Sequence, residues 1–452
     1  MIRLAPRTGK TSLLLYAACL VLVVLTLFRY WEPPTPKTHL DFWGEPFYLA
    51  VSLALGHGYQ DPFPTLSTGP SAHIAPGFPA LLSLIIVSFG TGTDGAQAML
   101  MSAALATAII IGLLPIVSHR LGLGYLPGFI AASAWLVAKI PLNAQFENAY
   151  AGLLTLAVIF FLAKLPQDQY RQSTLLLLGT AIGLLALFSP TCVAPTLASV
   201  VWLAPRVWRP SGRRYWTYLI LIPALFIIPW ITRNYVVLHR FVPLRDNFGL
   251  ELAVSNNDCA PYGMLINIRD GCFNRVHPSR SFAEARRVRT LGEPRYNDVR
   301  LHEAAAWIKT HQSRFWQLTY QRALAFWFPY ENGSMLLTLH YERYRAAYAM
   351  IYTLTILSIP GLFLLARSNR SLMVLFGIWL VLFPVPYYVI QYHFRYRMPI
   401  LWITFLVGSL PLARIAETLW ARLRTGRTID VFQPTAWFLE NSNQHVTEKS
   451  RQ

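Results

Sequence analysis

Pro79-Ala-Leu-Leu-Ser-Leu-Ile-Ile-Val-Ser-Phe89 is the stretch that decides how this chain is arranged. It is apolar, but it has only eleven residues and is bounded by Pro76-Gly77 and by Gly90. A helix needs about 20 mostly apolar residues to cross a bilayer. We therefore predict that the segment lies at the membrane surface and does not span it. The direction of every later helix follows from that choice.

The composition is that of a protein embedded in a membrane. Hydrophobic residues make up 54% of the 452 and charged residues only 13%, whereas a soluble domain carries about a quarter charged residues. Apolar runs of membrane length recur along the whole chain. Because a helix satisfies its own backbone hydrogen bonds in lipid, we predict an all-α polytopic membrane protein.

About ten transmembrane helices are predicted when Pro79–Phe89 stays at the surface. They are Leu13–Phe28, Ala96–Val117, Tyr125–Ile140, Ala149–Ala163, Leu175–Phe188, Cys192–Leu203, Tyr218–Ile231, Tyr348–Leu365, Leu372–Ile390 and Ile400–Leu412. The basic clusters Arg206–Arg214 and Arg367/Arg370 then lie in the cytoplasm, as the positive-inside rule requires. A spanning Pro79–Phe89 would place Arg206–Arg214 outside. Both termini are predicted to be cytoplasmic.

The formal net charge of +18 has the same origin. In a soluble protein such a charge would indicate nucleic-acid binding. Here the basic residues gather at helix ends, where the positive-inside rule places them. We therefore predict no nucleic-acid partner.

The predicted topology divides the chain into four parts. Residues 1–231 form an N-terminal transmembrane core with a first outer loop at 30–95, and residues 232–343 form a second, partly helical outer loop that acts as a cap. Residues 344–414 hold the last transmembrane helices, and residues 415–452 are a polar cytoplasmic tail. Cys259 and Cys272 lie in the second loop. An oxidising compartment would let them form a disulfide, and two free thiols are the alternative.

Two acidic residues stand close together in the first outer loop. Glu45 begins a short amphipathic helix with Pro46 at its first position, and Asp41 precedes it at helical spacing. A third acid, Glu147, lies in the short outer loop between the third and fourth predicted spans. A carboxylate can cap a helix, but one near the lipid surface can also deprotonate an acceptor hydroxyl or hold a metal ion.

Arginines on the outer face run against the positive-inside rule. Arg233 ends the seventh predicted span, His239-Arg240 and Arg245 follow it, and the motif His393-Phe-Arg395-Tyr-Arg397 lies between the last two spans. Arginine suits forked recognition of phosphate, although the aromatic residues beside it also fit an interfacial belt. Basic and acidic groups on one face indicate a phosphate-bearing substrate presented from the membrane.

These features resemble the GT-C superfamily of membrane glycosyltransferases, in the branch of dolichyl-phosphate-mannose protein mannosyltransferases and bacterial aminoarabinose transferases. The resemblance covers residues 10 to 415 in layout. Three places carry it: Glu45 to Pro79 with Ala54-Leu-Gly-His-Gly-Tyr59, Trp230 to Glu251 with Asn256-Asn257, and Arg395-Tyr-Arg397-x-Pro399. It implies a GT-C-like helix bundle.

The resemblance also implies an inverting transfer of a sugar from a polyprenyl-phosphate donor outside the cytoplasm. Glu45 matches the presumed catalytic base and Glu147 the acid of the second outer loop. The donor phosphate would be held by basic residues, namely Arg233, Arg395, Arg397 and His393. The substrate cavity would be lined by polar residues of the first loop, namely Tyr48, His57, Tyr59 and His73.

Two departures from the family pattern leave roles open. The family more often has Asp where Glu45 stands, so Asp41 is a rival for the base. Ser189-Pro190-Thr191 occupies a helix-end turn where related transferases can carry a basic residue. Metal use varies in the superfamily, so a divalent metal is possible, with His57 and His73 as candidate ligands.

Two other functions remain as alternatives to an enzyme. A flippase or other transporter of lipid-linked sugars would bury ionisable groups near the membrane midplane. A non-catalytic partner in envelope glycan assembly would keep the helices and lose the acid. The acceptor, which can be a glycan, a lipid or a protein, is not identified by the sequence. On resemblance, a bacterial inner membrane is the expected location.

Overall fold

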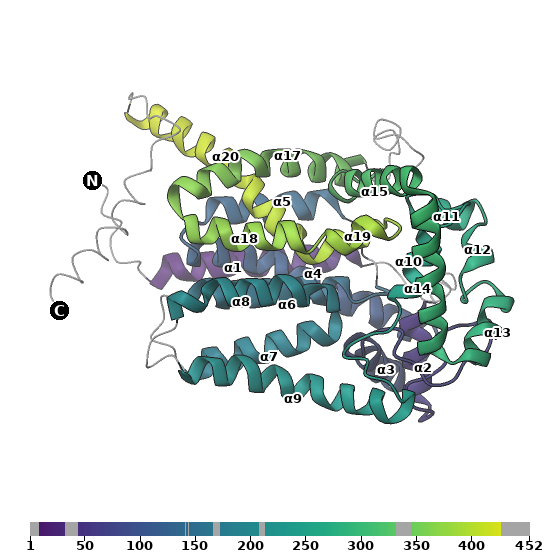
Figure 1. Cartoon of the computed structure of the whole chain (residues 1–452). Helices are drawn as coiled ribbons and strands as arrows, with labels where there is room; N and C mark the ends of the chain where they lie inside the picture. The colour runs from purple at the N-terminus through teal and green to yellow at the C-terminus, as the bar shows by residue number, and fades with distance from the viewer. Residues whose placement is uncertain are drawn as a thin grey trace.

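The computed structural model describes residues 9–31, 44–140, 142, 144–165, 172–207, 213–330 and 345–425. Helices make up its regular structure, and the described residues add only two isolated β-bridges. Figure 1 shows long helices running side by side, with shorter helices packed across one end of them. We call this covered end the outer end and the opposite one the inner end.

The bundle is built from apolar helices of two lengths. Six are long and apolar enough to cross a membrane: α1 (Gly9–Tyr30), α4 (Thr93–Arg120), α9 (Arg213–Leu238), α17 (Arg345–Ser368), α18 (Arg370–Leu382) continued by α19 (Val385–Val389), and α20 (Met398–Thr425), which the short η3 (Phe394–Arg397) precedes. Four shorter apolar helices pack among them: α5 (Leu126–Ala138), α6 (Asn148–Lys164), α7 (Gln172–Phe188) and α8 (Val193–Val207). These elements match the predicted all-α membrane fold.

α20 forms the centre of the bundle. Every residue from Met398 to Leu410 is buried, and the helix packs against α17, α5 and α6. Two glycines allow α17 and α20 to approach closely. A Cβ on Gly361 would lie 2.1 Å from the carbonyl oxygen of Val407, and one on Gly408 would lie 2.2 Å from that of Leu354. Small residues at helix contacts are typical of membrane bundles.

Helices at the edge of the bundle expose apolar side chains. On α9, Ile220, Leu225 and Val236 are each more than half exposed, as expected for a surface that faces lipid. Two helices are longer than the apolar runs predicted. α9 continues past residue 231 to Leu238, and α20 continues to Thr425, through the beginning of the predicted tail.

The stretch Pro79–Phe89 forms α3 (Gly77–Phe89), which packs on α2 (Glu45–Ala54) and on α4. With 13 residues it is too short to cross a bilayer unaided. Figure 1 places α2 and α3 together at the outer end, beside the cap. That this stretch does not span the membrane stays a prediction, and its position beside the cap is compatible with it.

The cap consists of helices α10 to α15. They are α10 (Phe248–Ser255), α11 (Met264–Arg269), α12 (Phe273–Val276), α13 (Phe282–Leu291), α14 (Glu293–Thr310) and α15 (Gln312–Trp327). Cys259 and Cys272 form the expected disulfide, with an S–S distance of 2.03 Å. Phe63 of the first outer loop is buried in an apolar cluster with Leu250 and Val288 of the cap. The first outer loop and the cap thus share one core.

Candidate active site at the outer end of the bundle

Glu45 lies where the first outer loop meets the cap. Gly44 has extended backbone, and α2 begins at the next residue with Pro46 in its first turn. The Glu45 Oε1 accepts a hydrogen bond of 2.5 Å from the hydroxyl of Ser279, which is 234 residues further along the chain. The carboxylate is therefore held between two elements that the sequence places far apart.

Two buried histidines flank this carboxylate. His73 and His277 are each 2% exposed, and burial lowers their pKa values to about 3 and about 4. The ring of Phe63 lies edge-on to both of them, with centroid distances of 5.0 and 6.0 Å. Both imidazoles are therefore neutral at neutral pH and can act as hydrogen-bond donors or acceptors.

The surroundings of Glu45 favour its charged form. Burial acts to raise its pKa, but His277, His73 and the Ser279 hydrogen bond outweigh burial and lower the pKa below its ordinary value. Hydrogen bonding to a carboxylate favours ionisation. Glu45 is thus a carboxylate at neutral pH, which is the form that can accept a proton.

A second acid, Glu251 of α10, lies in the same electrostatic environment. Burial raises its pKa to about 7, and the charge of Glu45 acts in the same direction, whereas Arg245 and Arg395 oppose the shift. Two neighbouring acids with pKa values moved apart are typical of sites that divide acid and base roles.

Arg395 and Arg245 supply the positive charge of this region. Arg395 is 7% exposed, and its guanidinium stacks 3.4 Å from the ring centroid of Phe146. Arg245 comes from the segment between α9 and α10, and among the described residues its side chain has no hydrogen-bond or ion-pair partner. We call the set of polar and charged residues at this end the outer cluster: Glu45, His73, Arg245, Glu251, His277, Ser279 and Arg395.

Glu147 lies at the edge of the outer cluster. It precedes α6 directly, and its charge acts on Tyr387 and on Cys192. Thr191, in the turn between α7 and α8, shares a hydrogen bond of 3.0 Å with the hydroxyl of Tyr387. Tyr387 in turn stacks on Tyr396 at 4.5 Å. The Ser189-Pro190-Thr191 turn therefore contributes hydroxyls here in place of a basic residue.

Arg233 has a different environment from the one predicted. It lies inside α9, and its guanidinium donates hydrogen bonds of 2.6 Å to the backbone carbonyls of Ser71 and Tyr59. These contacts fasten the first outer loop to α9. Because the guanidinium N–H groups of Arg233 bond to backbone carbonyls, Arg233 is better explained as a residue that holds the loop than as a ligand of the polyprenyl phosphate.

Arg397 and His393 also have protein partners where a role in binding the donor phosphate was predicted. The guanidinium of Arg397 donates to the carbonyl of Trp327 at 2.5 Å and to the hydroxyl of Thr355 at 2.7 Å. The Nδ1 of His393 accepts from the backbone N–H of Arg395 and caps η3. Burial and the nearby Arg395 charge lower the pKa of His393 well below its usual range, so it carries no charge for a phosphate. Both residues shape the turn that presents Arg395.

The predicted cavity residues separate into three kinds. His73 belongs to the outer cluster, and Tyr48 lies close enough to Glu45 and Arg280 for both charges to act on it. Tyr59 is buried, and its hydroxyl donates 2.7 Å to the carbonyl of Ile74, so it supports the loop. His57 is exposed in the turn after α2, and we withdraw it as a cavity residue and as a metal-ligand candidate.

Asp41 lies outside the described residues. Within the parts of the chain that are described, no group of three or more His, Cys, Asp and Glu side chains is placed to hold a metal ion.

Comparison with known proteins gives structural matches. No protein-family model and no curated protein sequence matches the chain. A solved structure of the archaeal oligosaccharyltransferase AglB from Archaeoglobus fulgidus, in complex with an inhibitory peptide and a dolichol-phosphate, matches with a TM-score of 0.54 and 12% identity. The match covers 97% of this chain and 55% of that one. This chain therefore spans about half the length of the oligosaccharyltransferase.

Two further structures match along most of this chain. The apo form of the Archaeoglobus fulgidus oligosaccharyltransferase has a TM-score of 0.53 and 13% identity, over 94% of this chain and 54% of that one. The match to ArnT from Cupriavidus metallidurans bound to undecaprenyl phosphate covers 94% of this chain and 82% of that one, at 14% identity. Its TM-score of 0.38 is too low for an argument from this likeness. The chain has the GT-C fold.

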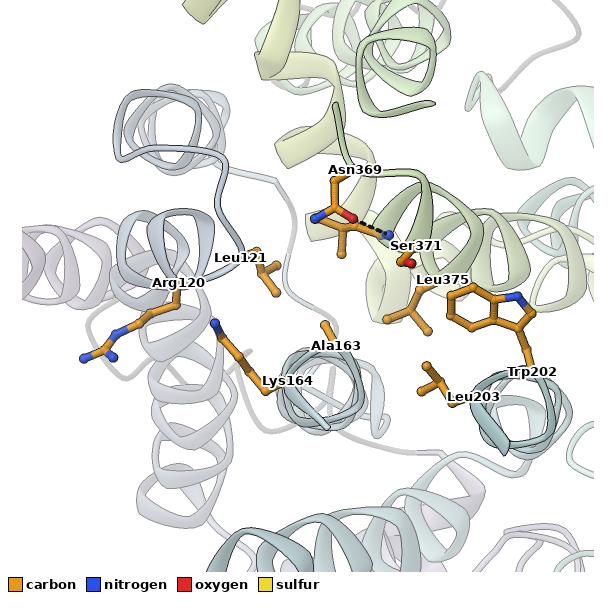
Figure 2. Close-up of a pocket in the computed structure, with 10 residues that line it drawn as sticks. Arg120, Leu121, Ala163, Lys164, Trp202, Leu203, Asn369, Ser371 and Leu375 are labelled. Carbon is orange, nitrogen blue, oxygen red and sulfur yellow. Dashed lines mark hydrogen bonds between the residues drawn. The ribbon is translucent and has the colours of Figure 1, made fainter. Parts of the chain in front are cut away.

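A pocket at the inner end of this GT-C bundle has a different character from the outer cluster. It is a cavity of about 170 Å³ lined by the ends of α4, α6 and α8 and the start of α18 (Figure 2). Its polar lining includes Arg120, Lys164 and Asn369, whose side chain accepts from the backbone N–H of Leu372. Its lining holds basic residues and no acid, as expected for an end that follows the positive-inside rule. The paired acids and arginines lie at the outer end of the GT-C bundle.

Three members of the outer cluster were not predicted from the sequence as site residues. His277 and Ser279 lie in the cap, and Glu251 entered only as the end of a motif range. Their local sequence, His277-Pro-Ser279-Arg280, has no recognisable catalytic pattern. Their role becomes visible only when the fold brings the cap onto α2.

Proposed function

We propose that this protein is an inverting glycosyltransferase that moves a sugar from a polyprenyl-phosphate donor to an acceptor hydroxyl on the extracytoplasmic face of a membrane. A bacterial inner membrane, with both termini in the cytoplasm, is the location we expect. One observation carries the proposal. At the outer end, the Glu45 carboxylate accepts a hydrogen bond from Ser279 of the cap and lies near Glu251, whose electrostatic environment it shares with Arg245 and Arg395.

This arrangement meets the needs of the reaction. Glu45 accepts the proton of the acceptor hydroxyl, and the acceptor oxygen attacks the anomeric carbon of the sugar. The bond between that carbon and the phosphate oxygen breaks, and polyprenyl phosphate leaves with the electron pair. Arg395 and Arg245 stabilise the charge that grows on the phosphate. Attack from the face opposite the phosphate inverts the anomeric centre.

The outer end also offers a way in for a lipid-linked donor. Leu84, Val87 and Phe89 on α3 are 66%, 69% and 57% exposed, so α3 presents an apolar face while its buried side packs on α2, the helix that Glu45 begins. A donor that stays in the bilayer can reach the cluster only at the membrane surface. The dolichol-phosphate bound by the oligosaccharyltransferase of similar fold makes this donor chemistry our first choice.

The test is a transfer assay in proteoliposomes. Purified protein is supplied with radiolabelled polyprenyl-phosphate hexoses and pentoses and with an envelope extract as acceptor. We expect wild type to transfer label from one of these donors and Glu45→Gln to lose that transfer. Asp94→Asn, which neutralises an exposed acid at the start of α4 on the same end, serves as the matched control and keeps the wild-type rate.

Two results would contradict the proposal. One is unchanged transfer by Glu45→Gln. The other is movement of the intact labelled donor across the bilayer with no transfer by wild type, which would identify a flippase. Labelling of Gly92→Cys from the inside of right-side-out vesicles would contradict the orientation.

A further inference from the structure

The outer cap carries an unbalanced positive charge. Between Phe273 and Arg300 the chain has seven arginines and three acidic residues. This segment lies on the side of the membrane where the positive-inside rule predicts few basic residues, if the proposed orientation holds. The excess therefore calls for an explanation other than topology.

Two of the seven arginines are neutralised within the cap. Arg287 donates to Glu284 at 3.0 Å and to Glu303 at 2.8 Å. Arg300 donates to Glu303 at 2.7 Å. The other five are exposed, and within the described part of the chain none of them makes an ion pair. We call this set the arginine surface: Arg275, Arg280, Arg286, Arg289 and Arg295.

On the helix α13, two of these arginines share the exposed face. Ala285 and Val288 are buried, whereas Arg286 and Arg289, three residues apart, are exposed. Like charges at this spacing repel each other and destabilise a helix. A repulsion of this kind is relieved when an anion binds between the two side chains. Figure 1 places α12 and α13 at the outer edge of the cap, facing away from the bundle.

The arginine surface reaches the outer cluster through Arg280. Ser279, whose hydroxyl donates to Glu45, is its direct neighbour in the chain. The charge of Arg280 acts on Tyr48 and on His277, both of which interact with Glu45. An anionic group on Arg280 would therefore lie beside the proposed catalytic base.

We propose that the acceptor is an anionic glycan, bearing carboxylate or phosphate groups, that lies along the arginine surface and delivers a hydroxyl to Glu45. This inference rests on the proposed function. An anionic membrane surface is the other possible partner, but the exposed face of α13 does not resemble a membrane-facing helix. An interfacial helix needs a broad apolar face. α3 has such a face, whereas α13 exposes arginines and one aromatic residue, Phe282, on which Arg286 stacks at 5.1 Å.

The experiment measures binding without a donor, so it does not depend on transfer. Full-length protein in nanodiscs of neutral phosphatidylcholine is titrated with an oligogalacturonate, a phosphorylated mannose oligosaccharide and a neutral malto-oligosaccharide of equal length. We expect one or both anionic probes to bind at least about tenfold more tightly than the neutral one. This preference should weaken as salt rises, because exposed charges are screened.

The variants show which arginines are responsible. Arg286→Gln/Arg289→Gln should weaken binding of the anionic glycan about tenfold. The matched control, Arg269→Gln/Arg314→Gln, removes the same charge from exposed cap positions where Arg269 pairs with Asp270 and Arg314 bonds to Gln317. It should stay within about twofold of wild type.

Three outcomes would overturn the inference. Equal binding of charged and neutral glycans would remove the anionic acceptor. An equal loss in the control double variant would show that net charge, and not this surface, attracts the probe. Preferential, arginine-dependent binding of soluble dihexanoyl phosphatidylglycerol over both anionic glycans would assign the surface to membrane lipid.

Discussion

Arg395 and Arg397 stand two residues apart in one motif, yet the fold uses them in different ways. Arg397 donates to a backbone carbonyl and a threonine hydroxyl, and so holds η3 against α15 and α17. Arg395 faces Glu251, whose pKa it affects, and stacks on Phe146. A buried cation whose donors end on the protein is structural, whereas one that faces other ionisable groups is available for chemistry.

The same distinction separates whole regions. Arg233 and Arg322 belong with Arg397 as anchoring residues. Arg322 is fully buried and donates to Asn256 and to the carbonyls of Val389 and Ser255, which fastens α15 to α10 and to α19. The outer cluster lies among these anchors. Substitutions in the cluster should therefore reduce activity, and substitutions of anchors should reduce stability.

A large effect on the rate is expected for the cluster arginines. Arg395→Gln and Arg245→Gln should each slow sugar transfer by about 10²- to 10³-fold, because each removes a group that stabilises the leaving phosphate. Initial rates in proteoliposomes and thermal unfolding are measured on the same preparations. We expect unfolding temperatures close to wild type. A normal rate in both variants would contradict the assignment.

An anchor should show the opposite pattern. Arg397→Gln should destabilise the protein by about 3 kcal/mol, since it leaves buried acceptors without their charged donor. Thermal unfolding of the detergent-solubilised protein provides the measurement. Arg314→Gln, at an exposed position of α15, is the control and should change stability by less than about 0.5 kcal/mol. An unchanged stability in Arg397→Gln would break the distinction between the two arginines.

The disulfide tests whether the cap needs support of its own. Cys259→Ser/Cys272→Ser removes a bridge with a sequence separation of 13, and should cost about 2 to 3 kcal/mol of cap stability. Limited proteolysis with and without reductant reports this loss. Wild type under reducing conditions should be cleaved in the cap as fast as the double variant. Equal resistance in all three samples would show that the bundle alone holds the cap.

A pH-dependent effect is expected for Glu293 of α14, which is buried, holds the first outer loop, and accepts hydrogen bonds from the hydroxyl of Ser71 and the N–H of Ala72. Burial raises its pKa from 4.5 to about 8. The folded protein therefore keeps a proton that the unfolded chain releases, and this contribution to stability is complete below pH 4.5 and is lost as pH rises through about 8. The unfolding temperature of wild type should fall across this window, and that of Glu293→Gln should fall less. Identical pH profiles would contradict a protonated Glu293.

Much of the fold was predictable because its causes are local. Apolar runs mark the helices of the bundle, and the short run Pro79–Phe89 forms one helix, α3, within the bounds that its flanking Pro76-Gly77 and Gly90 predict. Helix ends were less predictable. α9 and α20 extend beyond their apolar runs because a helix does not have to stop where the membrane does.

The candidate site was only partly predictable. Glu45 could be found because it is the first residue of a short amphipathic helix, which can be recognised from the neighbouring sequence alone. Ser279 and His277 could not, because their proximity to Glu45 depends on a contact across 234 residues. Nor could charge alone separate Arg395 from Arg233 and Arg397, since the difference lies in where each guanidinium finds its acceptors.

The most direct test of the central claim compares the three candidate carboxylates in one assay. Single-turnover sugar transfer is measured for Glu45→Gln, Asp41→Asn and Glu147→Gln in proteoliposomes with equal amounts of folded protein. If Glu45 is the base, Glu45→Gln should be slower than wild type by about 10³-fold, and the other two variants should stay within about tenfold. A wild-type rate for Glu45→Gln together with the loss of transfer in Asp41→Asn would contradict the account and move the base to Asp41.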